Sequence, residues 1–424
     1  MSPLSIIIVG AGLSGLAAAI QCVLSGHEVT VLESARELAE IGAGLQITPN
    51  ASRLLQNWGI YQKIRSCEPS TISVYRYTGQ LLAHEDNFDQ NIKYKYGAPF
   101  SDMHRVDLQQ AMVQKARELG VNLVLGTRVT GLDLETEAPR AEVYTDSGVI
   151  WDADLVVGAD GLWSKTRECL LGKSDPPLPT GDLAYRIVLR WDEIKDERLR
   201  DMVRNPGVRF WIGPGCHAVG YSLRGGEMFN LVLLVPDDLP EDVARADGNL
   251  EEMKKLFAGW DAVLTDLLSN ISTVHKWKLL HRDHLPTWTS PHSNLALIGD
   301  ACHPMLPYLA QGANSSIEDG AVLGLLLASV TDVEQLPETL GTFQRMRKER
   351  GEEIARQTFL QRRDFHLRDG VEQEERDRLM TSLLGQELEG PFPSRWTCPI
   401  VQKWLYGYDA EKEVEKIQRK SGVP

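Results

Sequence analysis

The sequence predicts an α/β protein in which a parallel-sheet domain is interrupted by a mixed, mainly antiparallel sheet and is followed by C-terminal helices. Three observations support this prediction. The chain opens on a βαβ pattern, with apolar runs over Leu4–Val9 and Glu28–Leu32 on either side of a helical pattern over Leu13–Ser25. Strand-like segments separated by Gly and Pro turns fill the region from about 180 to 280. Helical patterns dominate after Ile317, to about Asp369 and again near 371–384 and 409–419.

Length and composition set the broad class of protein. A chain of 424 residues, 42% hydrophobic and 25% charged, is typical of a globular protein with two or three domains. The net charge of −14 argues against nucleic acid and anionic membranes as partners. The six cysteines form no CxxC pair, so we expect reduced thiols in a cytoplasmic protein. Monomer and homodimer both remain open.

The uncharged stretch Ser2–His27 is long enough for a signal anchor or a transmembrane helix. No Lys or Arg precedes it, however, and four glycines interrupt it. A strand followed by a buried helix explains the stretch better, so we expect no membrane span.

The remaining elements divide between two domains. In the first, we expect a helix over Asp107–Leu119, strands over Val121–Leu125 and Asp154–Val157, and a returning strand over Leu295–Ile298. In the second, we expect four strands and two helices, joined in space by Ile72–Tyr77. These four strands are Ala184–Trp191, Val208–Ile212, His217–Leu223 and Phe229–Val235, and the helices are Leu250–Phe257 and Trp260–Leu268. The expected boundaries are 1–71, 101–179 and 281–330 for the first domain, 72–100 and 180–280 for the second, and 331–424 for a helical region.

A glycine fingerprint lies at the first strand–helix junction. Gly10, Gly12 and Gly15 form a GxGxxG, which allows a tight turn, close approach of a pyrophosphate and close packing of helix on strand. Glu33 ends the next strand, 18 residues after Gly15, where a carboxylate accepts hydrogen bonds from ribose hydroxyls. The pattern predicts a Rossmann-like domain that binds a dinucleotide.

Two further motifs favour FAD over NAD as that dinucleotide. Asp160 lies in a Gly-Ala-Asp-Gly segment at the end of a strand, and Asp300 lies in a Gly-Asp pair at the end of another. The latter runs on to Gly312, Ala313 and Asn314, before a helix expected to open near Ile317. A flavin needs a carboxylate for its ribityl chain and a helix N-terminus near its ring. A second GxGxxG is missing, which argues against disulfide reductases that bind two dinucleotides.

Together these motifs resemble the class A FAD-dependent aromatic monooxygenases, and in particular their salicylate-hydroxylase-like branch. The resemblance covers nearly the whole chain. It rests on the segments IGAGLQITPNA (41–51), HRVDL (104–108), GADG (158–161), GDACHP (299–304), NSSIEDGA (314–321) and WLYGYDAEK (404–412).

The resemblance implies roles for individual residues. Glu33 would bind the adenosine ribose, and Ala43 and Gly44 would lie beside the flavin. Arg105 would reach the pyrophosphate or ribityl chain, from a loop just before the helix expected to start at Asp107.

The later motifs receive roles in the same way. Asp160 would support the fold and cofactor contacts, and Asp300 would hold the ribityl–pyrophosphate region. Gly312, Ala313 and Asn314 would border the isoalloxazine ring.

The implied reaction reduces FAD with NADH or NADPH as a transient co-substrate. Oxygen then forms a flavin C4a-hydroperoxide that attacks an electron-rich aromatic ring. The inserted sheet would cover the substrate, with Arg186 and Tyr221 as the expected catalytic residues. Arg186 would pair with a carboxylate or phenolate, and Tyr221 would orient that oxygen. Packing within the sheet is the alternative for both.

Three other polar groups invite functional readings. His281 and His284 form an HxxH, but no further ligands are evident, so we expect no metal site. His303 would lie near the flavin, either aiding proton movement or packing. The cationic run Arg345, Arg347, Lys348 and Arg350 is expected to form a solvated helix face, with a nicotinamide phosphate site as the alternative.

The function expected from the sequence is therefore NAD(P)H- and O2-dependent hydroxylation of a phenolic or aromatic-acid substrate by an FAD enzyme. One alternative is a tailoring monooxygenase that epoxidises or dearomatises a secondary metabolite such as a polyketide or indole alkaloid. A flavin-binding scaffold without turnover is the alternative from another class, and a plain NAD dehydrogenase is more remote. The substrate and the choice between NADH and NADPH stay open.

Overall fold

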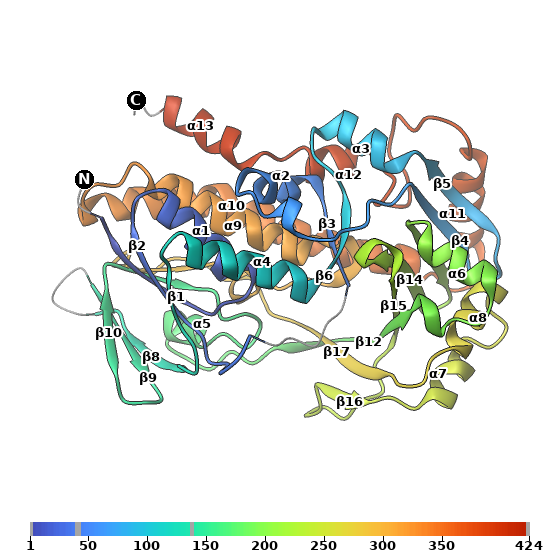
Figure 1. The fold of residues 1–424 in the computed structure, drawn as a ribbon, viewed down its shortest axis with the longest axis horizontal. Coiled ribbons are helices and arrows are strands. Elements are labelled where there is room, and N and C mark those ends of the chain that lie inside the picture. Colours follow the sequence, from blue (N-terminus) through green and yellow to red (C-terminus); the bar gives the residue numbers. More distant parts are fainter. Residues whose placement is uncertain (1–2, 39–43, 136–139, 421–424) are drawn as a thin grey trace.

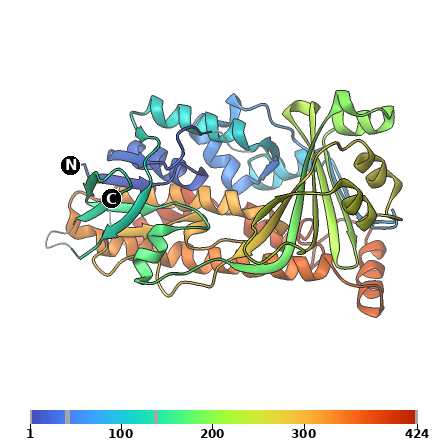
Figure 2. The same cartoon turned by 90° about the horizontal axis from the view of Figure 1, so that it is seen from below.

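The computed structural model describes residues 3–38, 44–135 and 140–420. One end of the molecule holds a parallel sheet and the other a larger mixed sheet, and two long helices run between them (Figures 1 and 2).

The parallel sheet has five strands in the order β18-β11-β1-β2-β7, and every pair of neighbours is parallel. Ile6, Ile7 and Ile8 are buried, as expected for a central strand covered on both faces. The predicted βαβ opening and the return of the strand near residue 295 are confirmed. The strands are β1 (Ser5–Val9), β2 (Glu28–Leu32), β7 (Asn122–Val124), β11 (Leu155–Gly158) and β18 (Leu295–Leu297).

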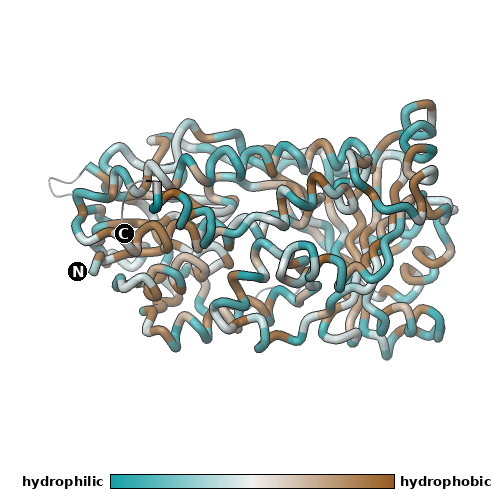
Figure 3. The backbone as a smooth tube through the Cα atoms, turned by 90° about the horizontal axis from the view of Figure 1, so that it is seen from above, coloured by the Kyte–Doolittle hydropathy of each residue, from teal (hydrophilic) through white to brown (hydrophobic). Residues whose placement is uncertain are grey.

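Helices α1 (Leu13–Leu24) and α9 (Gln311–Leu327) pack closely beside this sheet. Small residues allow the close approach: a Cβ on Gly320 would overlap the backbone of α1 at Ala18, and one on Gly324 would lie 2.7 Å from the Gln21 Cβ. Most residues of both helices are buried, and along the backbone hydrophobic residues alternate with hydrophilic ones on the outer helices (Figure 3). The N-terminus of α9 is thereby fixed relative to that of α1.

The mixed sheet has eight strands in the order β16-β17-β12-β15-β14-β13-β4-β5. Its neighbouring strands are antiparallel except β13 and β4, which are parallel. Because β4 pairs with both β13 and β5, the prediction that the segment near residue 72 joins this sheet is confirmed. The strands are β4 (Thr71–Arg76), β5 (Leu81–Asp86), β12 (Leu178–Arg190), β13 (Gly207–Gly213), β14 (Cys216–Leu223), β15 (Met228–Pro236), β16 (Arg245–Asp247) and β17 (His275–His281).

The two faces of the mixed sheet have different neighbours because side chains alternate along each strand. Leu183, Tyr185 and Ile187 of β12 pack with apolar side chains of three short helices, α6 (Glu197–Arg204), α7 (Leu250–Leu256) and α8 (Ala262–Ser269). Ala184 and Arg186 lie on the opposite face, toward the parallel-sheet domain. One face is thus core, and the other is available to form a site.

Smaller elements complete the fold. Strands β3 (Gly44–Ile47) and β6 (Ser101–His104) form an antiparallel pair, and β8 (Val129–Asp133), β9 (Ala141–Thr145) and β10 (Ile150–Ala153) form a separate sheet. The remaining helices outside the C-terminal region are α2 (Pro49–Asn57), α3 (Phe88–Tyr96), α4 (Arg105–Glu118) and α5 (Lys165–Leu171).

The C-terminal region is helical, as predicted, with α10 (Leu336–Phe365), α11 (Val371–Ser382), α12 (Pro399–Tyr406) and α13 (Ala410–Lys420). The helical pattern expected after Ile317, to about Asp369, is present and is divided between α9 and α10, but its first helix opens earlier than expected. Helix α9 begins at Gln311, because the left-handed Ala310 (φ 50°) redirects the chain there. It ends at Leu327, and a capping box between Asp332 and Gln335 starts the turn that leads into α10.

Within the described residues, no helix combines the length and the apolar character needed to cross a membrane.

Candidate active site

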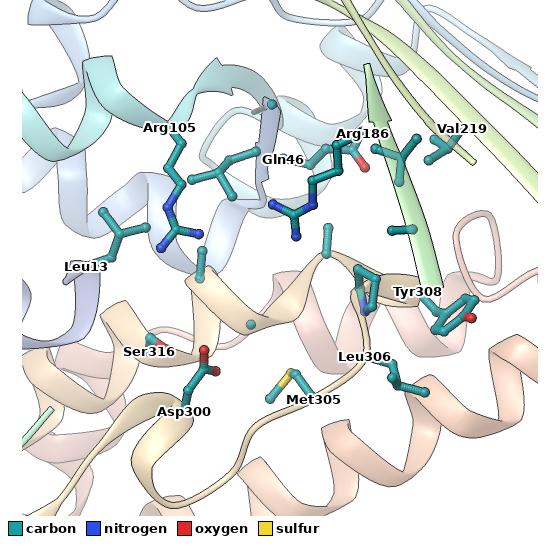
Figure 4. Close-up of a pocket in the computed structure, with 18 of the residues that line it drawn as sticks. Leu13, Gln46, Arg105, Arg186, Val219, Asp300, Met305, Leu306, Tyr308 and Ser316 are labelled. Carbon is teal, nitrogen blue, oxygen red and sulfur yellow. The ribbon is translucent and has the colours of Figure 1, made fainter. Parts of the chain in front are cut away.

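A cavity of about 290 Å³ lies between the parallel sheet and the mixed sheet (Figure 4). Its parallel-sheet end is lined by Gly12, Leu13, Ser14, Arg105, Ala159, Gly161, Asp300, Gly312, Ala313 and Ser316. Its mixed-sheet end is lined by Ala184, Arg186, Phe210, His217, Val219, Tyr221, Val232, Leu234 and Trp396. The two ends meet at a strand, Gly44–Gln46, and at the loop 305–310.

The three fingerprint glycines serve two different purposes. A Cβ on Gly10 (φ +103°) would lie 2.5 Å from the Ala159 carbonyl oxygen, and one on Gly15 would overlap the Gly10 carbonyl. A Cβ on Gly12 would meet no atom within 4 Å, and Gly12 lines the cavity. Gly10 and Gly15 are therefore glycines for packing, whereas Gly12 keeps space open for a ligand.

Gly12 also begins α1, whose first turn has no side-chain cap and no acidic residue. Free N–H groups and the positive end of the helix dipole therefore face the cavity, which favours an anion such as a pyrophosphate.

Glu33 lies at the end of β2 and stabilises the fingerprint turn. Its Oε2 accepts a hydrogen bond from the Ala11 N–H at 2.8 Å, and its Oε1 accepts one from the Ala35 N–H at 2.7 Å. The carboxylate is partly exposed but does not line the cavity. It fixes the backbone of the fingerprint turn, which lines the parallel-sheet end of the cavity at Gly12.

The two predicted aspartates differ in where they point. Asp160 accepts hydrogen bonds from the Lys165 and Thr166 N–H groups, at 2.7 and 2.9 Å, and from the Ser164 and Thr166 hydroxyls. It holds the start of α5, and its neighbours Ala159 and Gly161 line the cavity in its place. Asp300 lines the cavity directly.

Arg105 lines the cavity opposite Asp300 (Figure 4). It is the first residue of α4, so the expected loop position before a helix starting at Asp107 was wrong. Burial raises the pKa of Asp300, and the charges of His303 and Arg105 oppose this shift. A cationic and a carboxyl group thus face each other at the parallel-sheet end.

The wall between the two ends is held by amide side chains. Asn314 donates from Nδ2 to the Gln46 carbonyl at 2.9 Å and accepts from the Thr48 N–H at 2.9 Å, as a neighbouring strand would. Asn230 accepts from the Gly44 N–H at 2.9 Å. Gly312 and Ala313 line the cavity at the start of α9, whereas Asn314 holds β3. Ala43 lies outside the described residues.

Arg186 and Tyr221 both line the mixed-sheet end. The Arg186 guanidinium lies 4.4 Å from the centre of the Trp277 ring. Tyr221 is 5% exposed, and burial, reinforced by Asp102, raises the pKa of its hydroxyl. A Cβ on Gly44 would lie 2.5 Å from the Tyr221 ring, so Tyr221 packs directly on the β3 wall.

The sequence reasoning did not single out His217 and Tyr308, which also line the cavity. His217 Nδ1 lies 2.8 Å from His366 Nε2, and burial lowers the pKa of both imidazoles. Tyr308 donates a hydrogen bond to Asp182. No local signal pointed to them, because their partners lie 149 and 126 residues away in the sequence.

The predicted solvated face on α10 was wrong for two of its four cations. Arg347 is fully buried and Arg350 is 8% exposed. Arg347 Nη1 lies 2.6 Å from Glu318 Oε2 and its Nε lies 2.7 Å from Asp319 Oδ1, while Arg350 Nη2 lies 2.9 Å from Glu318 Oε1. Arg345 is exposed and Lys348 pairs with Glu352. Carboxylates buried on α9 require these partners on α10.

His303 belongs to the same buried cluster, because its Nε2 lies 2.5 Å from Asp319 Oδ2. Burial disfavours the imidazolium, but the charge of Asp319 outweighs it and raises the pKa of His303. Of the HxxH pair, His284 is exposed with Nδ1 3.7 Å from Glu352, and the His281 ring lies 5.5 Å from that of Phe359.

The residues present fit FAD. The bare α1 N-terminus and the open space at Gly12 suit the pyrophosphate, and Arg105 and Asp300 face the segment beyond it. The cavity lining at β3 and at the start of α9 includes Gly44, Gly312 and Ala313, which leave room for a planar ring.

Comparisons with known proteins agree with this fit. Residues 4–358 match the model of the FAD binding domain family. The chain is 49% identical over 415 residues to the FAD-dependent monooxygenase OpS4 of Beauveria bassiana, covering 96% of each chain. It is 31% identical over 417 residues to the 3-hydroxybenzoate 6-hydroxylase of Polaromonas naphthalenivorans, again covering 96% of each.

Solved structures share the fold. A salicylate hydroxylase substrate complex matches with a TM-score of 0.79 at 22% identity, over 98% of both chains. CtdE in complex with FAD and substrate 4 matches with a TM-score of 0.83 at 23% identity, over 99% of this chain and 98% of the other. The chain therefore belongs to the FAD binding domain family, among FAD-dependent monooxygenases that include aromatic hydroxylases.

Proposed function

We propose that this monooxygenase uses NADH or NADPH and O2 to hydroxylate a phenolic or aromatic-acid substrate. The observation that carries the proposal is that Arg186 and Tyr221 lie at the mixed-sheet end of the cavity, with Tyr221 packed on the Gly44 wall. A cation and a hydroxyl are thus close to where the flavin ring fits. The related 3-hydroxybenzoate 6-hydroxylase, which bears the name of a phenolic acid, supports the same substrate class.

The parallel-sheet end holds FAD in this proposal. Gly12 and the N-terminus of α1 bind the pyrophosphate, and Glu33 binds the adenosine ribose while supporting the turn at Ala11. Arg105 and Asp300 contact the ribityl–pyrophosphate region from opposite sides.

The flavin ring lies between β3 and α9. Gly44, Gly312 and Ala313 line the cavity there and would border it, and Asn314 holds β3 against the start of α9. Asp160 acts indirectly, by holding the backbone of residues 159–161 at the cavity wall. When bound, FAD supplies the activation of O2 that protein side chains do not provide.

Arg186 and Tyr221 orient the substrate. A guanidinium beside a phenolate or carboxylate stabilises the anion. The ring of an ionised phenol is more nucleophilic than that of the neutral phenol. Because burial keeps the Tyr221 hydroxyl protonated at neutral pH, this group donates a hydrogen bond to the same oxygen. His217, neutral for the same reason, offers its Nε2 to a polar group of the substrate.

A second candidate is oxidation of a larger secondary metabolite. It is favoured by the apolar far end of the cavity, where Phe210, Val219, Val232, Leu234 and Trp396 surround the space beyond Arg186. Product structure separates the two candidates.

We also propose a cytoplasmic location, since all six cysteines are free thiols.

The test is NADH and NADPH oxidation by the FAD-loaded protein across a panel of phenols, aromatic acids and polycyclic phenols, with product masses recorded. Fast, substrate-dependent oxidation of the donor with a product one oxygen heavier supports the proposal. Bound FAD without stimulation by any compound favours a non-catalytic flavin-binding scaffold.

A further inference from the structure

A second cavity, here called the outer cleft, opens behind the mixed-sheet end of the first. Its walls include Asp182 of β12, Gly215 just before β14 and Pro236 at the end of β15, and Arg362, His366 and Val371 from the corner between α10 and α11. None of these residues lines the first cavity.

The two cavities adjoin along three strands. On β12, at β14 and on β15, a residue lining the outer cleft lies two positions from a residue lining the first cavity, and the pairs are Asp182/Ala184, Gly215/His217 and Pro236/Leu234. On β12 and β15 such residues point to the same face and are separated by about 7 Å, and Gly215 adjoins β14 in the turn that precedes it. A single layer of side chains therefore separates the cavities.

Within this layer, hydrogen bonds join a side chain of the first cavity to a side chain of the outer cleft through Asp182. The Tyr308 hydroxyl, on the inner side, donates to the buried Asp182. Arg362, on the outer side, donates from Nε to Asp182 Oδ2 at 2.5 Å and from Nη2 to Oδ1 at 2.6 Å. The Asp182 carboxylate thus connects the two sides.

A second contact between the two cavities is made by a pair of histidines. His217 lines the first cavity, His366 lines the outer cleft, and their ring nitrogens lie 2.8 Å apart. The ring of Tyr308 lies 5.2 Å from that of His217 and 5.7 Å from that of His366, measured between centroids. These five side chains, Asp182, His217, Tyr308, Arg362 and His366, are called the seam below.

A bound FAD, as proposed above, fills the parallel-sheet end and closes that side of the first cavity. Substrate must nevertheless enter, and product leave, in every turnover. The outer cleft adjoins the other end, and only rotatable side chains separate it from that end. It carries apolar surface from Phe359 and Val371, cations at Arg363 and Arg368 and carboxylates at Asp369 and Glu372, a combination that offers an aromatic compound with polar substituents both apolar and polar contacts.

From these contacts, and resting on the proposed function, we infer that the outer cleft is a binding vestibule for the aromatic substrate. Substrate and product pass between it and the first cavity through the seam, which opens when Tyr308 and Arg362 separate at Asp182.

Binding kinetics of the FAD-loaded protein test this inference. A passage changes the association and dissociation rates by the same factor, and leaves the dissociation constant unchanged. The probes are 1-naphthol and 3-hydroxybenzoate. Each is mixed rapidly with the protein, and its binding is monitored by the change in flavin absorbance.

Arg362→Ala widens the seam, and we expect it to raise both rates about fivefold or more with little change in Kd. Val371→Trp narrows the vestibule at a residue that is 80% exposed, so folding is unaffected, and we expect both rates to fall together. Arg356→Ala is the matched control, because Arg356 also lies on α10 but pairs with Glu353 and does not line the outer cleft. Its rates should equal those of the wild type.

A change in Kd at constant association rate overturns the inference, as do unchanged rates in both variants. The inference is also contradicted if the wild-type protein binds neither probe. If Arg362→Ala fails to fold, Val371→Trp decides alone. Binding without any turnover would refute the proposed function, whereas the two rates would still decide on the vestibule.

Discussion

Arg347 of α10 and Asp319 of α9 form an ion pair in the interior, with Nε and Oδ1 2.7 Å apart and neither residue exposed. Burial opposes ionisation of Asp319, but the charges of His303 and Arg347 outweigh it and hold its pKa at about 2. Asp319 also accepts a hydrogen bond from the Gly299 N–H at 2.9 Å. The ion pair therefore supports the turn that presents Asp300 to the cavity.

Removing Arg347 should destabilise the protein strongly. In Arg347→Met, Asp319 loses a cation and Glu318 loses one of two, so we expect the free energy of unfolding to fall by about 3–5 kcal/mol. Urea unfolding measures the change. Arg345→Met is the matched control, because Arg345 is exposed on the same helix, and it should differ from the wild type by less than about 0.5 kcal/mol. Similar stabilities of the two variants would show that the cluster contributes little.

Two fingerprint glycines should respond differently to a side chain. Gly12→Val places atoms in open space at the cavity, so the apoprotein should keep its melting temperature while FAD binding is lost. Gly15→Ala meets the Gly10 carbonyl and should lower the melting temperature of the apoprotein itself. Thermal unfolding of both apoproteins and FAD titration check this. A Gly12→Val protein that binds FAD normally would place the pyrophosphate elsewhere.

The buried His366 should make stability depend on pH. Burial, against the charge of Asp182, lowers the pKa of His366 to about 4, whereas an unfolded histidine titrates near 6.5. Between these values the unfolded chain binds a proton that the folded chain does not. Stability is therefore complete above about pH 6.5 and decreases as the pH falls toward 4, by up to about 3 kcal/mol from this residue.

His366→Gln removes that contribution and should flatten the pH dependence over the same interval. Urea unfolding at a series of pH values from 4 to 7 measures it. Identical slopes for the variant and the wild type would mean that His366 binds protons equally in the folded and the unfolded chain.

Arg186 should affect catalysis more than cofactor binding. In Arg186→Ala, we expect product formation to fall by about 10- to 100-fold, because a charge-assisted hydrogen bond to the substrate is lost, while FAD content stays near that of the wild type. Arg186→Lys should recover part of the activity. Equal losses of FAD and of product would assign Arg186 to folding rather than to the substrate.

The sequence was informative where neighbouring residues determine the outcome. The turn at Gly10–Gly15, the strands at 5–9 and 28–32 and the segment before Asp300 follow from local patterns of glycine and β-branched residues. The face of β12 that carries Arg186 also follows, because strand residues alternate between the two faces.

Contacts between distant segments were not predictable in the same way. The sequence predicted a solvated helix face at Arg347 and Arg350, because their carboxylate partners lie on another helix. His217 joins the site only because β14 enters the mixed sheet beside β15, and its partner His366 comes from the end of α10. Local composition carries no trace of such pairings.

The most direct test of the central claim is turnover under ¹⁸O2 with NADH or NADPH and the best phenolic substrate of the panel, followed by mass spectrometry of the product. The account predicts that the product carries one oxygen atom from ¹⁸O2 and that its formation requires FAD. A product without the label, or consumption of the donor that yields only hydrogen peroxide with every compound tested, would contradict it.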